Sequence, residues 1–171
     1  MTSKLKTDVL ETVSGSGTIA LTNQLSGMTH ASVPSGSVLQ VVHATSTTAV
    51  ASTSTAYVHY SSSDATITPT STSSKILVLM ESNSAPYNDS THDAKQYEQI
   101  FRGSTGISKE LEIRGYDYGG SGSNVAGSAV INHLDSPNTV SSTTYSLRFR
   151  FVAGTNARIK SCSITLMEIK G

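Results

Sequence analysis

The feature that most constrains the fold of this chain is a long run without formal charge. No Asp, Glu, Lys or Arg lies between Glu11 and Asp64. Gly, Ser and Thr dilute the apolar residues of this run, so no stretch approaches the 18 or so apolar residues of a membrane-spanning helix. Disordered segments usually combine few β-branched residues with high net charge, and neither property holds here. Thr, Val and Ile are abundant and suit pleated chains, so the run predicts extended β structure.

The charge and composition of the chain argue against some classes of function. The formal net charge is zero and charged residues make up 14 % of the chain, well below the usual quarter. Ser and Thr make up about 30 % of the residues, so hydroxyls rather than ions keep the surface hydrated. These values argue against a broad basic surface for nucleic acid. We expect no nucleic-acid partner and no membrane insertion.

The sequence of the remainder of the chain predicts short strands separated by polar turns. Lys75–Glu81, KILVLME, is almost continuously apolar and predicts a central strand. Gln96–Arg102 fits either a strand or one turn of helix. Turn clusters such as SSSD and AGTNA lie between the segments. The expected strands are Ser37–Ala44, Thr55–Tyr60, Thr66–Pro69, Lys75–Glu81, Gln96–Arg102, Glu110–Arg114, Val125–Leu134, Thr144–Val152 and Arg158–Ile169.

Seven to nine strands without a long helix predict an all-β fold, a jelly-roll-like β-sandwich over residues 37–171. Thr144–Val152 alternates cleanly, with Tyr145 and Phe149 on the face opposite Arg148. Arg158–Ile169 has apolar residues on both faces, with Ile159 grouped with Ser161 on one of them. We therefore expect this strand to be covered on both sides for part of its length.

Residues 1–36 carry too few apolar side chains to form a core alone. The segment KLKTDVLETV fits a short helix or a strand equally well. We interpret residues 1–36 as an extended docking and trimerisation arm that buries its apolar groups against another chain; a flexible tail is the alternative. The apolar arm residues are Leu5, Val9, Val13, Ile19, Leu21, Leu25 and Met28.

Parts of the sequence resemble a known protein group. The N-terminal SKLKTDVLETVSGSGTIALTNQLSGMT and ASVPSGSVLQVV resemble the start of small structural, tail-fibre-like virion proteins of marine tailed phages of the cyanophage type. ITPTSTSSKILVLMES and the closing ITLMEIKG resemble the β-domain that follows in those proteins. The middle of the chain matches only in rhythm.

This resemblance implies a non-enzymatic virion part: a homotrimeric fibre or spike-like appendage. Our hypothesis adds that the arm contacts other virion proteins and that the β-domain meets host surface glycans. A threefold assembly lets three weakly apolar strips share one core. A capsid decoration protein that stabilises the shell is an alternative, and a free carbohydrate-binding module is an alternative of another class. The N-terminal MTSKLKTDVLE lacks the apolar core of a signal peptide, so we expect assembly in the host cytoplasm and a final location in the virion.

Two loops are candidate glycan or partner contacts. The first contains Tyr116, Asp117 and Tyr118 between glycines, and the second contains Tyr87, Asn88 and Asp89. Aromatic faces stack on sugar rings, while Asp and Asn side chains bond to hydroxyls. The alternative is that these tyrosines brace their loops or an interchain contact.

Other motifs point to no catalytic, cofactor or metal site. GSGTIA matches a dinucleotide fingerprint only formally, because no helix pattern or correctly spaced acid follows it. His92 lies near Asp89 and Asp93 without fixed ligand spacing. The other histidines are scattered along the sequence. Nothing in the sequence indicates that the acidic residues form the carboxylate pair of a glycosidase. These residues are His30, His43, His59, His133, Asp64, Glu110, Glu112 and Asp117.

Two further residues have simple interpretations. Cys162 is the lone cysteine, which excludes an intrachain disulfide, and we expect a small buried residue rather than a reactive thiol. Asn88 opens a formal glycosylation sequon, which has no role without export. We predict no enzyme activity and no cofactor.

Overall fold

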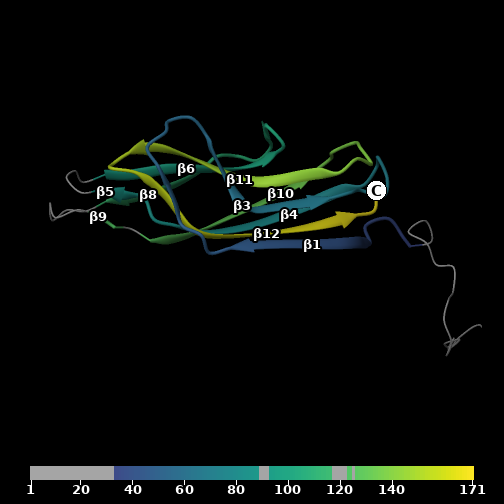
Figure 1. Cartoon of the computed structure of the whole chain (residues 1–171). Helices are drawn as coiled ribbons and strands as arrows, with labels where there is room; N and C mark the ends of the chain where they lie inside the picture. Colours follow the sequence, from purple (N-terminus) through teal and green to yellow (C-terminus); the bar gives the residue numbers. More distant parts are fainter. Residues whose placement is uncertain (1–32, 89–92, 117–122, 125) are drawn as a thin grey trace, which may run out of the picture. The chain divides into compact units, whose positions relative to one another are not determined.

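The computed structural model describes residues 33–88, 93–116, 123–124 and 126–171. Over these residues the fold is all-β, with two antiparallel sheets stacked as a β-sandwich (Figure 1). The compact unit that contains all of the strands spans Pro34–Gly171. Residues 1–32 lie outside the described residues, so the arm and its role stay predictions. In the described part, no helix is long and apolar enough to span a bilayer.

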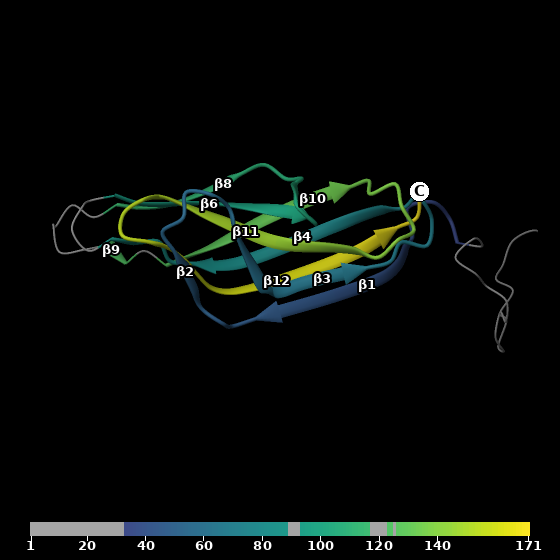
Figure 2. The same cartoon turned by 45° about the horizontal axis from the view of Figure 1, so that its top comes forward.

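Sheet A has the order β1-β12-β4-β10, with β2 also paired to β12. Sheet B has the order β3-β11-β6-β7, with β8 also paired to β6, and a third, two-stranded sheet joins β5 to β9. Figure 2 shows β4 and β12 inside sheet A and β11 inside sheet B. The strands are β1 (Val38–Ser46), β2 (Val50–Ser52), β3 (Val58–Ile67), β4 (Lys75–Ser84), β5 (Tyr87–Asn88), β6 (Asp93–Arg102), β7 (Thr105–Gly106), β8 (Leu111–Tyr116), β9 (Ser123–Asn124), β10 (Gly127–Asp135), β11 (Thr143–Ala153) and β12 (Ala157–Ile169).

The hydrophobic core lies between the two sheets, and alternation along each strand selects its members. On β4, Ile76, Val78 and Met80 point inward, and β11 contributes Tyr145, Leu147 and Phe149. The predicted central position of β4 is confirmed, because it lies between β12 and β10. The remaining fully buried large side chains come from both sheets: Tyr60, Ile67, Ile100, Ile159, Ile164 and Leu166.

Buried polar groups also tie the two sheets together. Glu98 of β6 is fully buried and accepts hydrogen bonds from the hydroxyls of Ser82 and Ser84 on β4. Asp135 of β10 accepts from the Tyr145 hydroxyl at 2.7 Å and from Arg102 at 2.8 Å. Both of these carboxyl groups therefore have partners on the opposite sheet, as buried polar groups require.

Two local predictions are overturned or resolved by the structure. SSSD is not a turn, because β3 runs through it as a single strand. Between Tyr145 and Leu147 the register shifts: β11 advances two positions while β3 advances five, from Tyr60 to Ala65, and both Tyr60 and Ser63 are buried. Gln96–Arg102 forms part of a strand rather than a helical turn.

The two faces of β12 also differ from the prediction. A register shift between Ile159 and Ser161 turns Ile159 inward, onto the face of Cys162 and Ile164. Met167 and Ile169 face outward and are only half-buried. The described part of the chain therefore covers one face of β12, not both.

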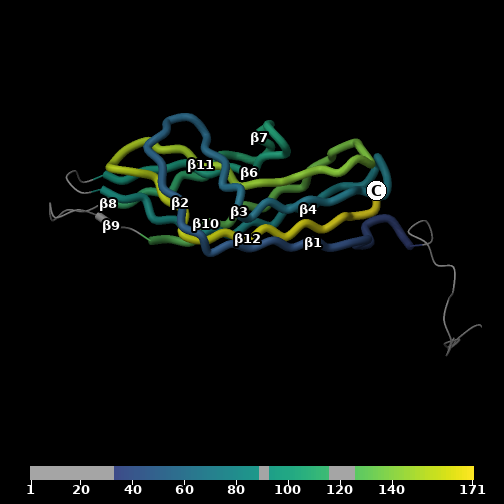
Figure 3. The backbone as a smooth tube through the Cα atoms, viewed as in Figure 1, coloured from purple at the N-terminus to yellow at the C-terminus, as the bar shows by residue number. Residues whose placement is uncertain are grey.

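The chain enters the sandwich at the end where it also leaves. The backbone N–H of Gly36 donates to the carbonyl of Lys170 at 2.8 Å, and the N–H of Lys170 donates to the carbonyl of Ser37 at 2.9 Å. The β11–β12 turn and β5 lie at the other end (Figure 3). The 13 residues of β12, at about 3.3 Å per residue, separate the two ends by about 40 Å.

Candidate functional site

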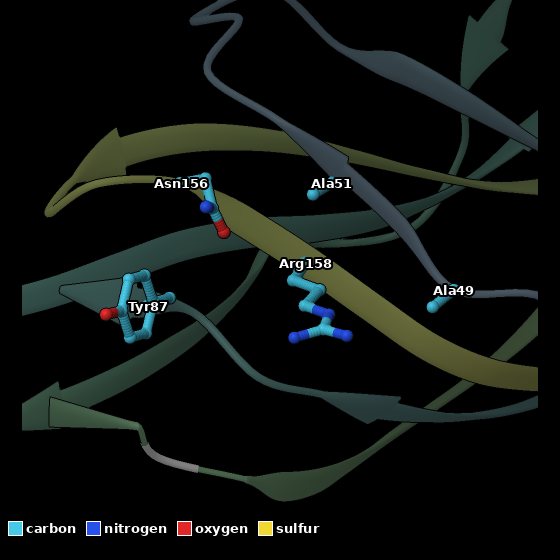
Figure 4. Close-up of a pocket in the computed structure, with 5 residues that line it drawn as sticks. All are labelled: Ala49, Ala51, Tyr87, Asn156 and Arg158. Atoms are coloured by element: carbon cyan, nitrogen blue, oxygen red, sulfur yellow. The ribbon is translucent and has the colours of Figure 1, made fainter. Parts of the chain in front are cut away.

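The candidate site is a pocket at the turn end of the sandwich (Figure 4). It encloses about 380 Å³ and is lined by Ala49, Ala51, Tyr87, Asn156 and Arg158. That volume lies within the range of small-ligand sites. Three structural segments meet here: the start of β2, the start of β5, and the β11–β12 turn with the first residues of β12.

The backbone around Tyr87 fixes the pocket wall. The Tyr87 carbonyl accepts hydrogen bonds from the N–H groups of Thr155 and Asn156, at 2.8 and 3.2 Å, and its N–H donates to the Asn156 carbonyl at 3.0 Å. The turn is made possible by Gly154, which has a φ of +101°. A Cβ atom at Gly154 would lie 2.8 Å from the Tyr87 carbonyl oxygen. The close approach of turn and strand therefore requires glycine.

Two polar groups in the pocket lack partners. The Asn156 Oδ1 atom is buried and has no hydrogen bond among the described residues. The Arg158 guanidinium makes no hydrogen bond or ion pair with any residue that the structure describes. The backbone N–H of Arg158 donates to Gln96 Oε1 at 2.8 Å. Figure 4 shows the side chains of Asn156, in the β11–β12 turn, and Arg158, on β12, extending to the same side of the ribbon. Buried polar atoms in native proteins usually have a partner, so an open acceptor marks a place for a ligand group or water.

The pocket is chemically suited to a polar ring-shaped ligand. The Tyr87 ring is half-buried and presents an apolar face. Arg158 supplies several fixed donors that match a carboxylate, and Asn156 supplies an amide. Among the lining residues that the structure describes, none is an Asp, Glu, Ser, Thr or Cys.

Only part of the predicted contact set is described. Tyr87 lines the pocket, as a glycan contact requires. Asn88 is 1 % exposed and donates through Nδ2 to the Asp93 carbonyl at 3.0 Å, so its side chain braces the loop. Tyr116 ends β8, and nothing is described of its side chain; Asp89, Asp117 and Tyr118 lie outside the described residues.

A second surface of interest covers the outer face of sheet B. Arg150 stacks its guanidinium on the rings of Tyr57 and Tyr97, at 5.6 and 4.5 Å from their centroids. The Tyr57 hydroxyl donates to Glu110 at 2.6 Å, and the Tyr97 hydroxyl donates to Glu112 at 2.8 Å. Burial and the Glu110 hydrogen bond raise the pKa of Tyr57 to about 12. Hydrogen bonds from Tyr57 and Arg150 lower the pKa of Glu110.

These groups satisfy one another, which distinguishes this surface from the pocket. Lys95 pairs with Glu112 at 2.7 Å, and Arg114 pairs with Asp93 at 2.8 Å. Glu110 and Glu112 are therefore ion-pair partners of basic side chains. Their pairing leaves the pocket as the better candidate for binding.

The remaining candidate residues have structural surroundings. Cys162 is 2 % exposed, and burial raises the pKa of its thiol to about 11, which confirms the buried-residue interpretation. His43 bonds to Thr165 at 2.9 Å and His59 pairs with Asp64 at 2.8 Å. No group of three or more His, Cys, Asp or Glu suited to a metal occurs in the described part. His30 and His92 lie outside it.

Sequence reasoning missed Asn156 and Arg158. AGTNA signalled the turn, and Arg158 stood at the edge of a predicted strand. Nothing local to either residue places it beside Tyr87, because that contact depends on pairing between segments about 70 positions apart. No protein-family model matches the chain, and no curated protein sequence matches it.

Proposed function

We propose that the chain is a non-enzymatic structural protein of a tailed-phage virion whose sandwich contacts an acidic host-surface saccharide in the Tyr87–Arg158 pocket. The proposal joins the resemblance of the N-terminal sequence to virion proteins with the chemistry of the pocket. It keeps residues 1–36 as the docking arm and a homotrimer as the copy number that this arm holds.

One observation carries the proposal: the pocket and the entry of the chain lie at opposite ends of the sandwich. Gly36 is bonded beside Lys170 at one end, and Tyr87 is bonded to the β11–β12 turn at the other. Attachment through the segment before Pro34 leaves the pocket about 40 Å away along the strand direction. An appendage that is anchored at one end and binds at the other needs this arrangement.

A jelly roll is the proposed topology. β1 pairs with β12, β3 with β11, β4 with β10 and β6 with β8. This nested pairing is that of one long hairpin rolled into two four-stranded sheets, the pattern of jelly-roll domains. Such domains occur in viral capsids and in lectins, so the topology supports both parts of the proposal.

The saccharide class follows from the unpaired guanidinium. Arg pairs with carboxylates in a two-bonded, planar geometry, and an aromatic ring stacks on the apolar face of a pyranose. A uronic acid or another carboxylated sugar carries a chemical partner for each group. A neutral sugar would leave the Arg158 donors to water.

Binding is tested by titrating the full chain with oligouronates and with matched neutral oligosaccharides. We expect oligouronates to bind more tightly, and Arg158→Gln and Tyr87→Ala each to raise the Kd at least tenfold. Tyr87→Phe keeps the ring and Lys109→Gln removes an exposed cation elsewhere, so both controls should retain affinity. Equal affinity of Arg158→Gln and wild type for the oligouronate would contradict the assignment.

The virion role is tested separately. Particles assembled with a chain that lacks residues 1–30 should not contain it, because the arm makes the attachment. Normal incorporation of the shortened chain would refute the docking role. It would leave a free carbohydrate-binding module as the better reading of the pocket.

A further inference from the structure

The outer face of sheet A carries an exposed apolar row that crosses all four long strands. Val41, Met167, Leu77 and Leu134 are successive partners across β1, β12, β4 and β10. Val41 is 56 % exposed and Leu134 is 52 % exposed. Contiguous apolar area on one face marks an interaction surface more often than scattered residues do.

Two charged side chains bracket this row on the same strand. β4 presents Lys75, Leu77, Leu79 and Glu81 outward, while Ile76, Val78 and Met80 point into the core. Lys75 and Glu81 are exposed, and neither has an ion-pair partner among the residues that the structure describes. The outer face of β4 thus ends in a free cation on one side of the apolar row and a free anion on the other.

We propose that two copies of the chain pack face to face through sheet A, about a twofold axis at the level of Val78. The axis lies between the two faces and perpendicular to the strands. Position 78 is midway between 75 and 81, so Lys75 of each copy meets Glu81 of the other. The two apolar rows then lie side by side across the axis, about 6.6 Å apart at 3.3 Å per residue, as interdigitating sheet faces do.

Charge complementarity selects this partner. A twofold axis pairs each face with itself in reverse, which brings opposite charges together twice. A threefold arrangement of the same faces with strands along the axis would place three Glu81 side chains at one level and three Lys75 side chains at another. Like charges placed together are unfavourable, so the twofold pairing is preferred.

The face is large enough for a stable contact. Four strands at about 4.8 Å and nine residues at about 3.3 Å give a footprint of about 570 Å² per copy, or about 1,100 Å² in total. This exceeds the about 1,000 Å² that a specific interface needs. Thr165 and Asn132 flank Leu79 in the next row along the strands, so the apolar row of each copy lies opposite this mixed row of the other.

Sedimentation velocity of the full chain at tens of micromolar tests the pairing. We expect a mass equal to an even number of chains. Leu77→Glu places a charge in the apolar row and should halve that mass, whatever number of copies the N-terminal arm holds together. Val140→Glu alters a residue outside the strands of sheet A that is 52 % exposed, like Leu134 in the row, and should leave the mass unchanged. Circular dichroism checks that each variant is folded.

A charge exchange makes the test independent of apolar packing. Lys75→Glu sets two carboxylates against each other and should weaken the association at least tenfold. The double variant Lys75→Glu/Glu81→Lys restores opposite charges across the axis and should restore the wild-type mass. An odd number of wild-type chains, no change in mass with Leu77→Glu, or failure of the double variant to recover would each overturn the proposal.

Discussion

At the residue scale, the sandwich is unusual in placing carboxyl groups between its sheets. Glu98 is fully buried and its nearest donors are uncharged: the hydroxyls of Ser82 and Ser84 and the amide of Gln96, at 2.8 Å for the amide. Burial is the largest influence and raises the pKa of Glu98, while the three hydrogen bonds oppose it. Folding therefore favours the protonated form of this group.

The pH dependence of stability follows from that direction. The stability contributed by Glu98 is fully present below the carboxyl pKa of the unfolded chain, about 4.3, and is lost as pH rises through the raised native pKa. Glu98→Gln keeps the size of the side chain without its charge, so urea unfolding should show a smaller fall in stability with rising pH. Glu112→Gln is a control of opposite sign, because hydrogen bonds lower the pKa of Glu112. An unchanged pH profile in Glu98→Gln would contradict a buried titrating carboxyl.

The second inter-sheet carboxylate gives a prediction of ordinary hydrogen-bond size. Tyr145 is fully buried and donates to Asp135, which also pairs with Arg102. Tyr145→Phe removes one bond to a charged acceptor and should lower the free energy of unfolding by about 1.5–3 kcal/mol. Tyr97→Phe removes an exposed bond to Glu112 and should cost less than about 1 kcal/mol. Equal losses of unfolding free energy in the two variants would show that burial does not strengthen the Tyr145–Asp135 hydrogen bond.

At the scale of elements, periodicity predicted strands well and their irregularities poorly. Alternation in TYSLRFRFV placed Tyr145, Leu147 and Phe149 inside, because one face of β11 is fully covered. The register shifts in β3 and β12 could not be predicted from the sequence, because the position of a bulge depends on the partner strand and not only on the local sequence. Tyr87 was found as a candidate because an aromatic between Pro86 and Asn88 stands out in a loop. Asn156 and Arg158 were not predicted as candidates, because they come close to Tyr87 only when β5 pairs with the β11–β12 turn in the fold.

The turn itself is open to a direct test. Gly154→Ala adds a methyl group where the Tyr87 carbonyl oxygen lies 2.8 Å away, at a φ of +101°. We expect a loss of about 1–3 kcal/mol in unfolding free energy and weaker saccharide binding, since the pocket wall must shift. Gly127→Ala, which meets no atom within 4 Å and has no positive φ, serves as the matched control. Equal stability of the two variants would show that the turn tolerates a side chain.

At the scale of the whole molecule, the outer faces of the two sheets differ in how their charged side chains are arranged. The outer face of sheet B carries paired ions over aromatic rings, and the outer face of sheet A carries an apolar row between two unpaired charges. The pocket occupies the end far from the entry of the chain. The proposed sites of association between copies and of saccharide contact thus lie on different parts of the sandwich, and a variant in one should leave the other intact.

The central claim, an appendage with an outward saccharide pocket, is tested most directly by cryo-EM of particles that contain this chain. We expect density for the sandwich on the particle surface, with residues near Pro34 toward the particle and Tyr87 and Arg158 toward solvent. Absence of the chain from purified particles, or a pocket covered by a neighbouring virion protein, would contradict it.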